Sequence, residues 1–187
     1  MFRLEEIFFY FVFYSVLGWV YETVLCSLEE KKAVNRGFLC GPYCPIYGAG
    51  AVLFLLLLGR EQSPILIFVL GAAVACALEY LTSFIMEKAY GQRWWDYSER
   101  FLNLNGRICL AGAIVFGLFA VLLIKFIHPA VIFAFSGVNR TVFLAIDVAA
   151  TAVLTFDFIL ALVGTKKEIS YQKKRIEKAY PYLKKSK

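Results

Sequence analysis

The chain has 187 residues, of which 60% are hydrophobic and 17% aromatic, and its formal net charge is +6. A soluble domain of this length could not bury so much apolar surface around one core, so the composition predicts an integral membrane protein. The positive charge is not accompanied by an aromatic and basic recognition module, so nucleic acid is not an expected partner.

Five apolar segments predict an all-α, polytopic bundle of membrane helices, because each reaches or nearly reaches the roughly 17 to 25 residues that a spanning helix needs. In chain order they cover about residues 5–28, 45–59, 64–88, 107–127 and 141–164, and the second is short. The first segment is expected to be retained, since acidic residues stand beside Arg3 and no small-residue cleavage site follows it. Residues 1–164 are therefore predicted to form the bundle.

The positions of the basic residues predict which ends of these helices face the cytoplasm. With the N-terminus outside and the C-terminus inside, sixteen of the 20 Lys and Arg residues fall on the inside and four on the outside. Residues 165–187 then form a basic cytoplasmic tail. This tail is predicted to lie on the inner leaflet as an amphipathic helix, with a solvated charged tail as the alternative.

The first unusual segment, residues 36–50, interrupts an apolar stretch with four glycines and two prolines. Such a sequence cannot stay helical throughout. Because the helix that follows is too short to cross alone, the part near residues 37–48 either dips into the membrane as a re-entrant or broken helix, or forms a plain cytoplasmic loop before a tilted helix. The residues singled out here are Arg36, Gly37, Gly41, Pro42, Cys44, Pro45, Tyr47 and Gly48.

The second unusual segment, residues 94–107, joins the predicted third and fourth helices. Its aromatic rings suit the headgroup boundary, but this does not explain why polar residues crowd the same stretch. Asn105 and Gly106 predict a turn, after which Arg107 would open the fourth helix, either lining a site or extending to water. The residues singled out here are Trp95, Asp96, Tyr97, Asn103, Asn105 and Arg107.

Acidic residues inside the predicted spans are the main functional candidates, because a carboxylate at membrane depth costs several kcal/mol unless a polar group meets it. At ~1.5 Å per residue, three acids lie roughly 9 to 13 Å from the inner ends of their helices. These are Glu22, Glu79 and Asp157. Asp147, by contrast, belongs near an outer end. A polar stripe at four-residue spacing leads along the third helix to the shared level and consists of Glu79, Ser83 and Glu87.

The shared level predicts one polar cavity that opens to the cytoplasm. Its predicted lining is Glu22, Glu79, Asp157 and Arg107, with the two unusual segments as caps. The alternative is that each acid pairs with a tyrosine, asparagine or arginine only to lock the bundle. No metal site is expected, because Cys40 and Cys44 lack zinc spacing and the sole histidine, His128, is predicted on the opposite side.

Residues 36–48 (RGFLCGPYCPIYG) and 95–109 resemble the CmpB-type family of small bacterial membrane proteins, labelled as type IV ABC-transporter permeases. The second motif is WDYS at residues 95–98 followed by Asn103, Asn105, Gly106, Arg107, Ile108 and Cys109. The resemblance covers nearly all of the chain up to about Gly164. It implies a multi-pass protein of the bacterial cytoplasmic membrane and favours a transport role without naming a substrate.

No cofactor is expected, since the sequence contains no G-x-x-x-x-G-K-[ST] phosphate loop and ATP would have to be bound by a separate ATPase subunit. Five helices are few for a complete translocation path, so transport would require a homodimer or a hetero-oligomer. Membrane lipids are the other expected partners.

Three functions remain open from the sequence. The leading one is a transport component whose cytoplasm-facing cavity binds a small substrate or a coupling ion. The second is an intramembrane enzyme or binding protein for a lipid or isoprenoid headgroup at the inner leaflet, in which acids transfer protons and Arg107 and Arg36 hold a phosphate. The third is a non-catalytic accessory or scaffold subunit. The sequence shows no recognisable pair of a nucleophile and a general base. Catalytic residues are therefore not assigned, and an enzyme is not the favoured hypothesis.

Overall fold

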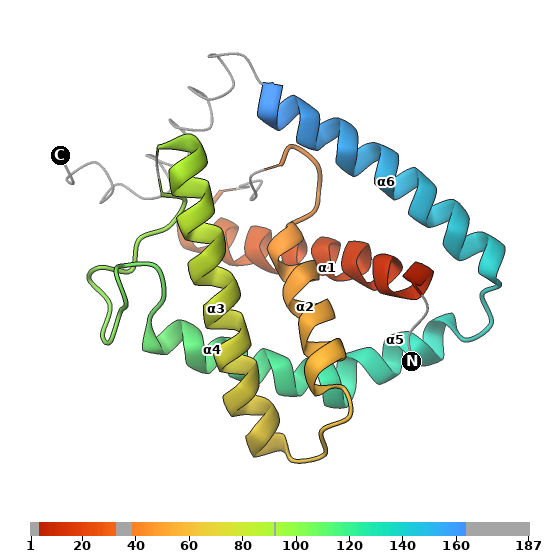
Figure 1. Cartoon of the computed structure of the whole chain (residues 1–187), viewed down its shortest axis with the longest axis horizontal. Helices are drawn as coiled ribbons and strands as arrows, with labels where there is room; N and C mark the ends of the chain where they lie inside the picture. Colours follow the sequence, from red (N-terminus) through yellow and green to blue (C-terminus); the bar gives the residue numbers. More distant parts are fainter. Residues whose placement is uncertain (1–3, 33–38, 92, 164–187) are drawn as a thin grey trace. The chain divides into compact units, whose positions relative to one another are not determined.

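The computed structural model describes residues 4–32, 39–91 and 93–163, and these residues form helices joined by loops (Figure 1). The helices are α1 (Leu4–Glu30), α2 (Pro45–Leu58), α3 (Pro64–Tyr90), α4 (Leu110–Leu122), the π-helical η1 (Leu123–Ile127), α5 (His128–Phe135) and α6 (Arg140–Val163). In this described part of the chain no β-strand occurs, only an isolated bridge between Leu104 and Ile108. The predicted all-α class is confirmed.

Within the described ranges, four helical stretches are long and apolar enough to cross a membrane. They are Glu6–Leu28, Pro64–Ala89, Leu110–Phe135 and Arg140–Ala161. The helix α2 has 14 residues and is therefore about 21 Å long, which is less than the roughly 30 Å of a hydrocarbon core. The chain is thus a helical membrane protein, and its described part contains four long apolar helices and one short one. The predicted orientation and the tail at residues 165–187, which lies outside the described residues, stay predictions.

The chain divides into two compact units. Unit 1 contains α1, residues 39–52 with the first part of α2, and the chain from residue 135 through α6. Unit 2 contains the remainder of α2 from residue 53, then α3 and the chain up to residue 134. The predicted separation into a bundle and a tail is a different division, and it stays a prediction.

In unit 1, α1 packs against α6 through aromatic rings and against the start of α2 through a glycine. The ring of Phe9 lies edge to face with the rings of Phe135 and Phe143, with centroids 4.9 Å apart in each case. A Cβ on Gly48 would overlap the carbonyl oxygen of Phe11 and the hydroxyl of Ser15. Glycine at this position therefore lets the backbone of α2 touch α1, as small residues do in membrane helix packing.

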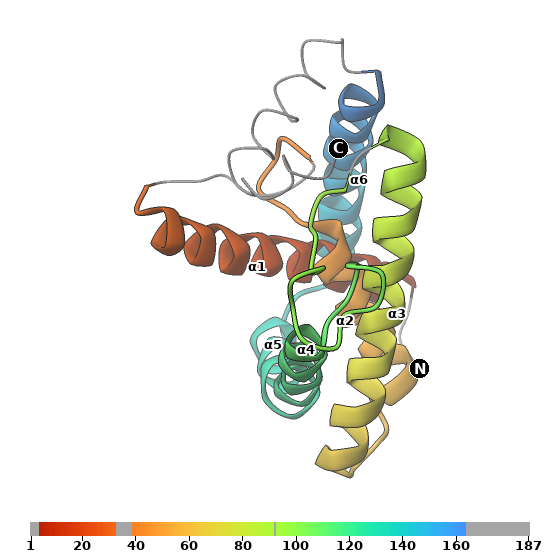
Figure 2. The same ribbon diagram turned by 90° about the vertical axis from the view of Figure 1, so that its left-hand side faces the viewer.

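In unit 2, α3 crosses and packs closely on α4 (Figures 1 and 2). Small residues lie at the contact from both sides. A Cβ added to Gly71 would overlap the side chain of Ala120, and one added to Gly117 would meet the ring and the carbonyl of Phe68. This close approach fixes where the loop between α3 and α4 begins and ends.

The fourth apolar helix differs from the predicted range of 107–127 at both ends. It starts at Leu110, because Asn105 and Gly106 form a turn with φ of 53° and 67° and the sulfur of Cys109 caps the helix by accepting from the amide of Gly112. Arg107 therefore precedes the helix, and the prediction that it opens it was wrong. At the other end the helix continues to residue 135. The wide π turn directly before Pro129 relieves the clash that a proline ring makes with the preceding turn.

Candidate functional site

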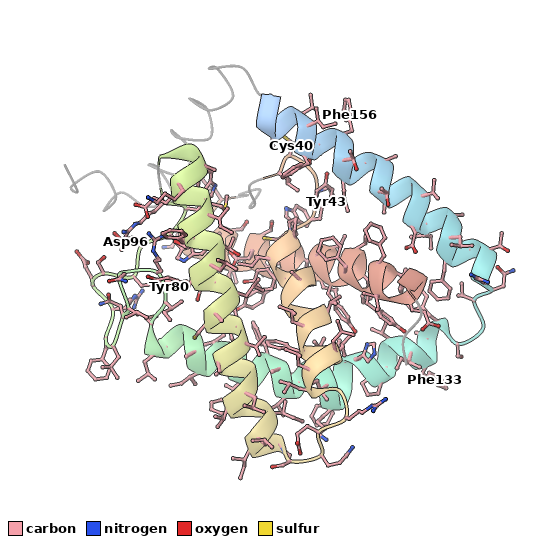
Figure 3. All side chains as sticks on the ribbon, viewed as in Figure 1. Cys40, Tyr43, Tyr80, Asp96, Phe133 and Phe156 are labelled. Atoms are coloured by element: carbon pink, nitrogen blue, oxygen red, sulfur yellow. The ribbon has the colours of Figure 1, made fainter. Side chains whose placement is uncertain are left out.

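The carboxylate of Asp157, in α6, holds the irregular segment that precedes α2. Its Oδ1 accepts from the amide of Cys40 at 3.3 Å, and its Oδ2 accepts from the amide of Gly41 at 3.0 Å and from the Tyr43 hydroxyl at 2.5 Å. Figure 3 shows Cys40 and Tyr43 near α6. Asp157 is only 6% exposed. All three donors are uncharged, so one buried carboxylate satisfies backbone groups that a non-helical segment would otherwise leave unpaired.

A glycine is needed at position 41 so that Tyr43 can reach this carboxylate. The aromatic ring of Tyr43 lies where a Cβ on Gly41 would be, and the amide of Tyr43 donates to the Gly41 carbonyl at 2.9 Å. Burial, followed by the hydrogen bond to Asp157, raises the pKa of Tyr43 above its usual range. Tyr43 therefore remains a hydrogen-bond donor at neutral pH.

A second acid of unit 1, Glu22 in α1, accepts from the Tyr47 hydroxyl at 2.5 Å. The Tyr47 ring occupies the space left by the missing side chain of Gly18, and the amide of Cys44 donates to the Ser15 carbonyl at 2.9 Å. Tyr43 and Tyr47 are four residues apart and meet acids from different long helices. The start of α2 is thus tied to α1 and the preceding segment to α6.

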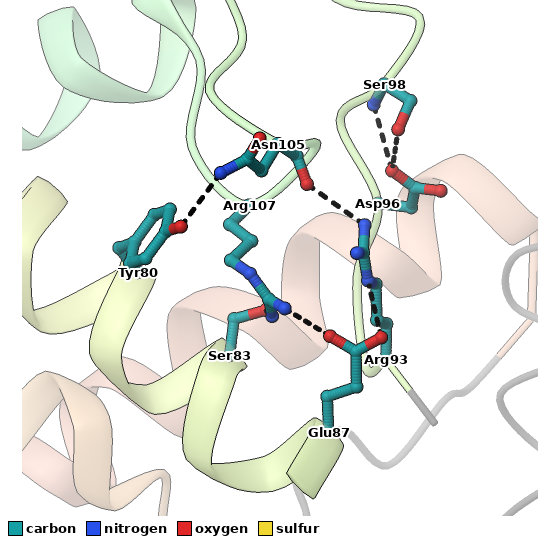
Figure 4. A network of polar contacts seen from close by, with 8 residues as sticks. All are labelled: Tyr80, Ser83, Glu87, Arg93, Asp96, Ser98, Asn105 and Arg107. Carbon is teal, nitrogen blue, oxygen red and sulfur yellow. Dashed lines mark hydrogen bonds and ion pairs between the residues drawn. The ribbon is translucent and has the colours of Figure 1, made fainter. Parts of the chain in front are cut away.

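In unit 2, Arg107 forms the centre of a polar cluster (Figure 4). Its side chain is buried, and its guanidinium donates to the Ser83 hydroxyl at 2.9 Å and to the carboxylate of Glu87. The same guanidinium lies 5.6 Å from the ring centroids of Tyr80 and Phe84, where cation–π attraction adds to the ion pair. Arg107, which was predicted as a site residue, is therefore bound to side chains of α3.

Further contacts bind both arms of the loop to the same face of α3. Arg93 pairs with the other carboxylate oxygen of Glu87 at 3.1 Å and donates to the Asn105 carbonyl at 3.0 Å. The Asn105 side chain donates to the Tyr80 hydroxyl at 2.9 Å, and Figure 4 shows these contacts as one chain of partners. The Trp95 indole donates to the carbonyl of Arg107 at 2.9 Å.

Two other predicted site residues fold the loop itself. The Oδ1 of Asp96 accepts from the amide and the hydroxyl of Ser98, at 2.9 Å and 2.5 Å. The Asn103 amide donates to the carbonyls of Ser98 and Arg100, and its Oδ1 accepts from the amide of Gly106. These are local side chain to backbone bonds of the kind that shape turns.

The buried acid of unit 2, Glu79 in α3, accepts from the Tyr97 hydroxyl at 3.1 Å. Its other oxygen is 4.0 Å from the position that a Cβ on Gly112 would take, and Gly112 lies in the first turn of α4. The positive end of a helix favours a negative group there. Glu79, Ser83 and Glu87, together with Tyr80, make hydrogen bonds from α3 to the loop.

The structure therefore places the predicted site residues in two groups. Glu22 and Asp157 belong to unit 1, and Glu79 and Arg107 belong to unit 2, so the single cavity lined by all four stays a prediction. Arg36 and Gly37 lie outside the described residues.

Three residues that complete these groups were not predicted from the sequence, namely Tyr43, Tyr80 and Arg93. A usable signal existed for Tyr43, since it stands one helical turn before Tyr47 in a segment already recognised as unusual. The roles of Tyr80 and Arg93 depend on how the loop folds back, which no spacing rule supplies.

The described residues form long apolar helices and one short helix, with buried acids that hold two loops. This architecture is that of a polytopic helical membrane protein. A family model described as "Putative ABC-transporter type IV" matches residues 9–162, and the chain belongs to this family. The resemblance found in the sequence is thereby confirmed. No curated protein and no solved structure matches the chain.

Proposed function

We propose that the chain is the permease-like, membrane-embedded subunit of an ABC-type transporter in the bacterial cytoplasmic membrane, and that it works with a separate ATPase subunit. The family supports the transporter class. The observation that carries the proposal is the buried carboxylate of Asp157, which lies inside a candidate span and holds non-helical backbone through uncharged donors.

This arrangement suits binding because irregular backbone at membrane depth is tolerated only against protein or around a watery cavity. Transporters of known mechanism use such breaks to bind substrates and coupling ions through freed backbone groups. The segment 39–44 contacts Asp157 and Ser15, and both of these residues belong to candidate spans. A small polar substrate or a coupling ion that binds beside Asp157 would act on the carboxylate and on the segment together.

The proposed cavity also includes Glu22 and Glu79, which are the other acids that accept from tyrosine hydroxyls. Arg107 is proposed to serve this site indirectly. Its guanidinium is bound to Glu87 and Ser83, so it holds the loop between α3 and α4 in place instead of binding the ligand. An intramembrane carboxylate is a functional candidate by default, and the contacts of Asp157 with the described residues are all with uncharged donors. Asp157 is therefore the first residue to test.

The test begins with purification of the tagged chain in mild detergent, followed by identification of copurifying proteins. We expect an ATPase subunit, and we expect the Asp157→Asn variant to lower the ATP hydrolysis of the complex in vesicles by about tenfold or more, because hydrogen bonds to a charged acceptor are lost. Asp147→Asn is the matched control, since it makes the same change in the same helix ten residues away. Full activity of Asp157→Asn, or purification without any ATPase, would contradict the proposal.

A further inference from the structure

A turn in the loop between α3 and α4 exposes three apolar side chains in close succession. Phe101, Leu102 and Leu104 are 76%, 66% and 55% exposed. We refer to residues 101–104 as the apolar tip. Single exposed apolar residues are ordinary on protein surfaces, but a group of large ones on one projecting turn marks an interaction surface.

The apolar tip is held in this exposed position by the loop around it. The Asn103 side chain binds the carbonyls of Ser98 and Arg100, and the carbonyl of Phe101 accepts from the amide of Leu110 at 3.4 Å. Leu102 has a φ of 48°, a left-handed conformation that costs an ordinary residue roughly 1 to 2 kcal/mol. Strain of this kind persists only where surrounding contacts enforce it, so the outward direction of these side chains is built into the loop.

The position of the apolar tip within unit 2 is also fixed. The candidate span of α3 ends at Ala89, and the next candidate span begins at Leu110, to which Phe101 is hydrogen-bonded. Arg107 clamps the base of the loop to α3. The loop runs from the end of α3 to the start of α4 (Figure 1), so it joins the two candidate spans. The tip is continuous with the half-exposed, apolar first turn of α4, where Leu110 is 39% exposed.

The charges of the loop do not favour a strongly charged partner. Arg93 and Arg107 are both paired with Glu87, and Asp96 is occupied by Ser98. This leaves Glu99 and Arg100, which are exposed, adjacent and opposite in sign. The apolar tip would therefore bind a partner mainly through burial of its apolar surface. The apolar medium next to two membrane spans is lipid.

We propose that the apolar tip inserts into the boundary between headgroups and acyl chains of the membrane that the helices span. Lipid is the occupant of this surface, and the tip acts as a third attachment of the loop besides its two helices. Trp95 fits this position, since indole rings settle at the same boundary. The proposal depends on the chain being a membrane protein but not on the transport function.

The test uses the full chain with the photoreactive residue benzoylphenylalanine at one position, reconstituted in vesicles of phosphatidylethanolamine and phosphatidylglycerol and also studied in native membranes. At position 101 we expect lipid adducts in a yield within about twofold of that at position 133, an exposed apolar site within a candidate span. Phe133 is 83% exposed and lies in a candidate span. The matched control is position 99, adjacent on the loop but polar in the native chain, where we expect a yield about fivefold lower.

A second measurement uses the native side chains, because the photoreactive group is itself apolar. Hydrogen exchange of residues 99–104 is expected to be slower in vesicles than in detergent, and the Phe101→Ser, Leu102→Ser double variant is expected to lose this difference while the helices keep theirs. The proposal is overturned if position 101 forms adducts with a protein in native membranes, if its lipid yield equals that of position 99, or if exchange is the same in both media.

Discussion

The segment before α2 and the loop after α3 are both held by acids on long helices, but in different ways. Asp157 holds residues 39–44 through two backbone amides and a phenol, all uncharged. Glu87 holds the loop after α3 through Arg93 and Arg107, with aromatic rings around the second of these. Removing one partner of a buried ion pair lowers the stability of a protein strongly, because the other charge is left buried and unpaired.

This difference indicates distinct roles for the two regions. The Arg107 cluster is balanced in charge and has the character of a fixed support. Within the described residues, the Asp157 carboxylate is bound by uncharged donors, so its state is more easily changed by a ligand. Four substitutions test this contrast, in order of decreasing effect.

Replacing Arg107 with Ala is expected to have the largest effect on stability, because it removes a buried guanidinium that binds Glu87 and lies over the rings of Tyr80 and Phe84, although Glu87 keeps its pair with Arg93. We expect a loss of about 2 to 4 kcal/mol in the free energy of unfolding, from the lost charged hydrogen bonds and cation–π contacts, measured as a lower Tm in detergent. The control Arg100→Ala, at an exposed position, should stay within about 0.5 kcal/mol. Equal effects of the two changes would show that the cluster does not support the loop.

Replacing Asp157 with Asn keeps the shape but removes the charge that accepts three hydrogen bonds. The expected cost is about 1 to 3 kcal/mol, with faster hydrogen exchange confined to residues 39–44. Asp147→Asn should leave the exchange of this segment unchanged. If Asp157→Asn instead destabilised the chain as much as Arg107→Ala, the proposed contrast between the regions would be wrong.

Replacing Gly41 with Ala separates the position of Tyr43 from the charge of Asp157. The added Cβ would overlap the Tyr43 ring, so the hydroxyl should move off the carboxylate. We expect a loss of about 1 to 3 kcal/mol, the usual cost of overpacking, with ultraviolet absorbance or fluorescence of tyrosine reporting the change. At Gly137 an added Cβ meets nothing within 4 Å, so Gly137→Ala is the control. A Tm equal to that of the control would mean that the segment adapts without loss.

Replacing Tyr47 with Phe should have the smallest effect, since it removes one hydroxyl from Glu22 and keeps the ring that packs on Gly18. The expected cost is about 1 kcal/mol. Tyr21→Phe, at a neighbouring ring 6.2 Å away, provides a comparison measured by the same thermal unfolding. A cost well above that of any single hydrogen bond would indicate that Glu22 has a larger role than the contacts of Tyr47 suggest.

Hydropathy was sufficient to predict the helical membrane class, because apolar runs of this length have no other way to satisfy their backbone groups in lipid. The cost of charge at membrane depth also directed attention to Glu79 and Asp157, which are indeed buried. The partners of these acids could not be predicted in the same way. Which phenol reaches which carboxylate depends on the rotation of each helix and on close approaches such as Gly48 against α1.

The ends of the fourth helix show a second limit of sequence reasoning. A turn at Asn105 and Gly106 was expected, but the three residues between this turn and Leu110 fold back as a bridge to Leu104 before the helix begins. The apolar segment was expected to end near residue 127, yet the helix continues through a π turn to Phe135. Both features depend on local hydrogen bonds that residue composition does not reveal.

The π turn at Leu123–Ile127 also determines in which direction around the helix axis the side chains after it point. The amide of His128 reaches back five residues, to the carbonyl of Leu123, so the chain holds one residue more than a regular turn allows. One residue corresponds to a rotation of about 100° around the axis. Deleting a single residue from this turn would therefore rotate the downstream side chains by about 100°, and the now buried Val131 would leave its present packing position.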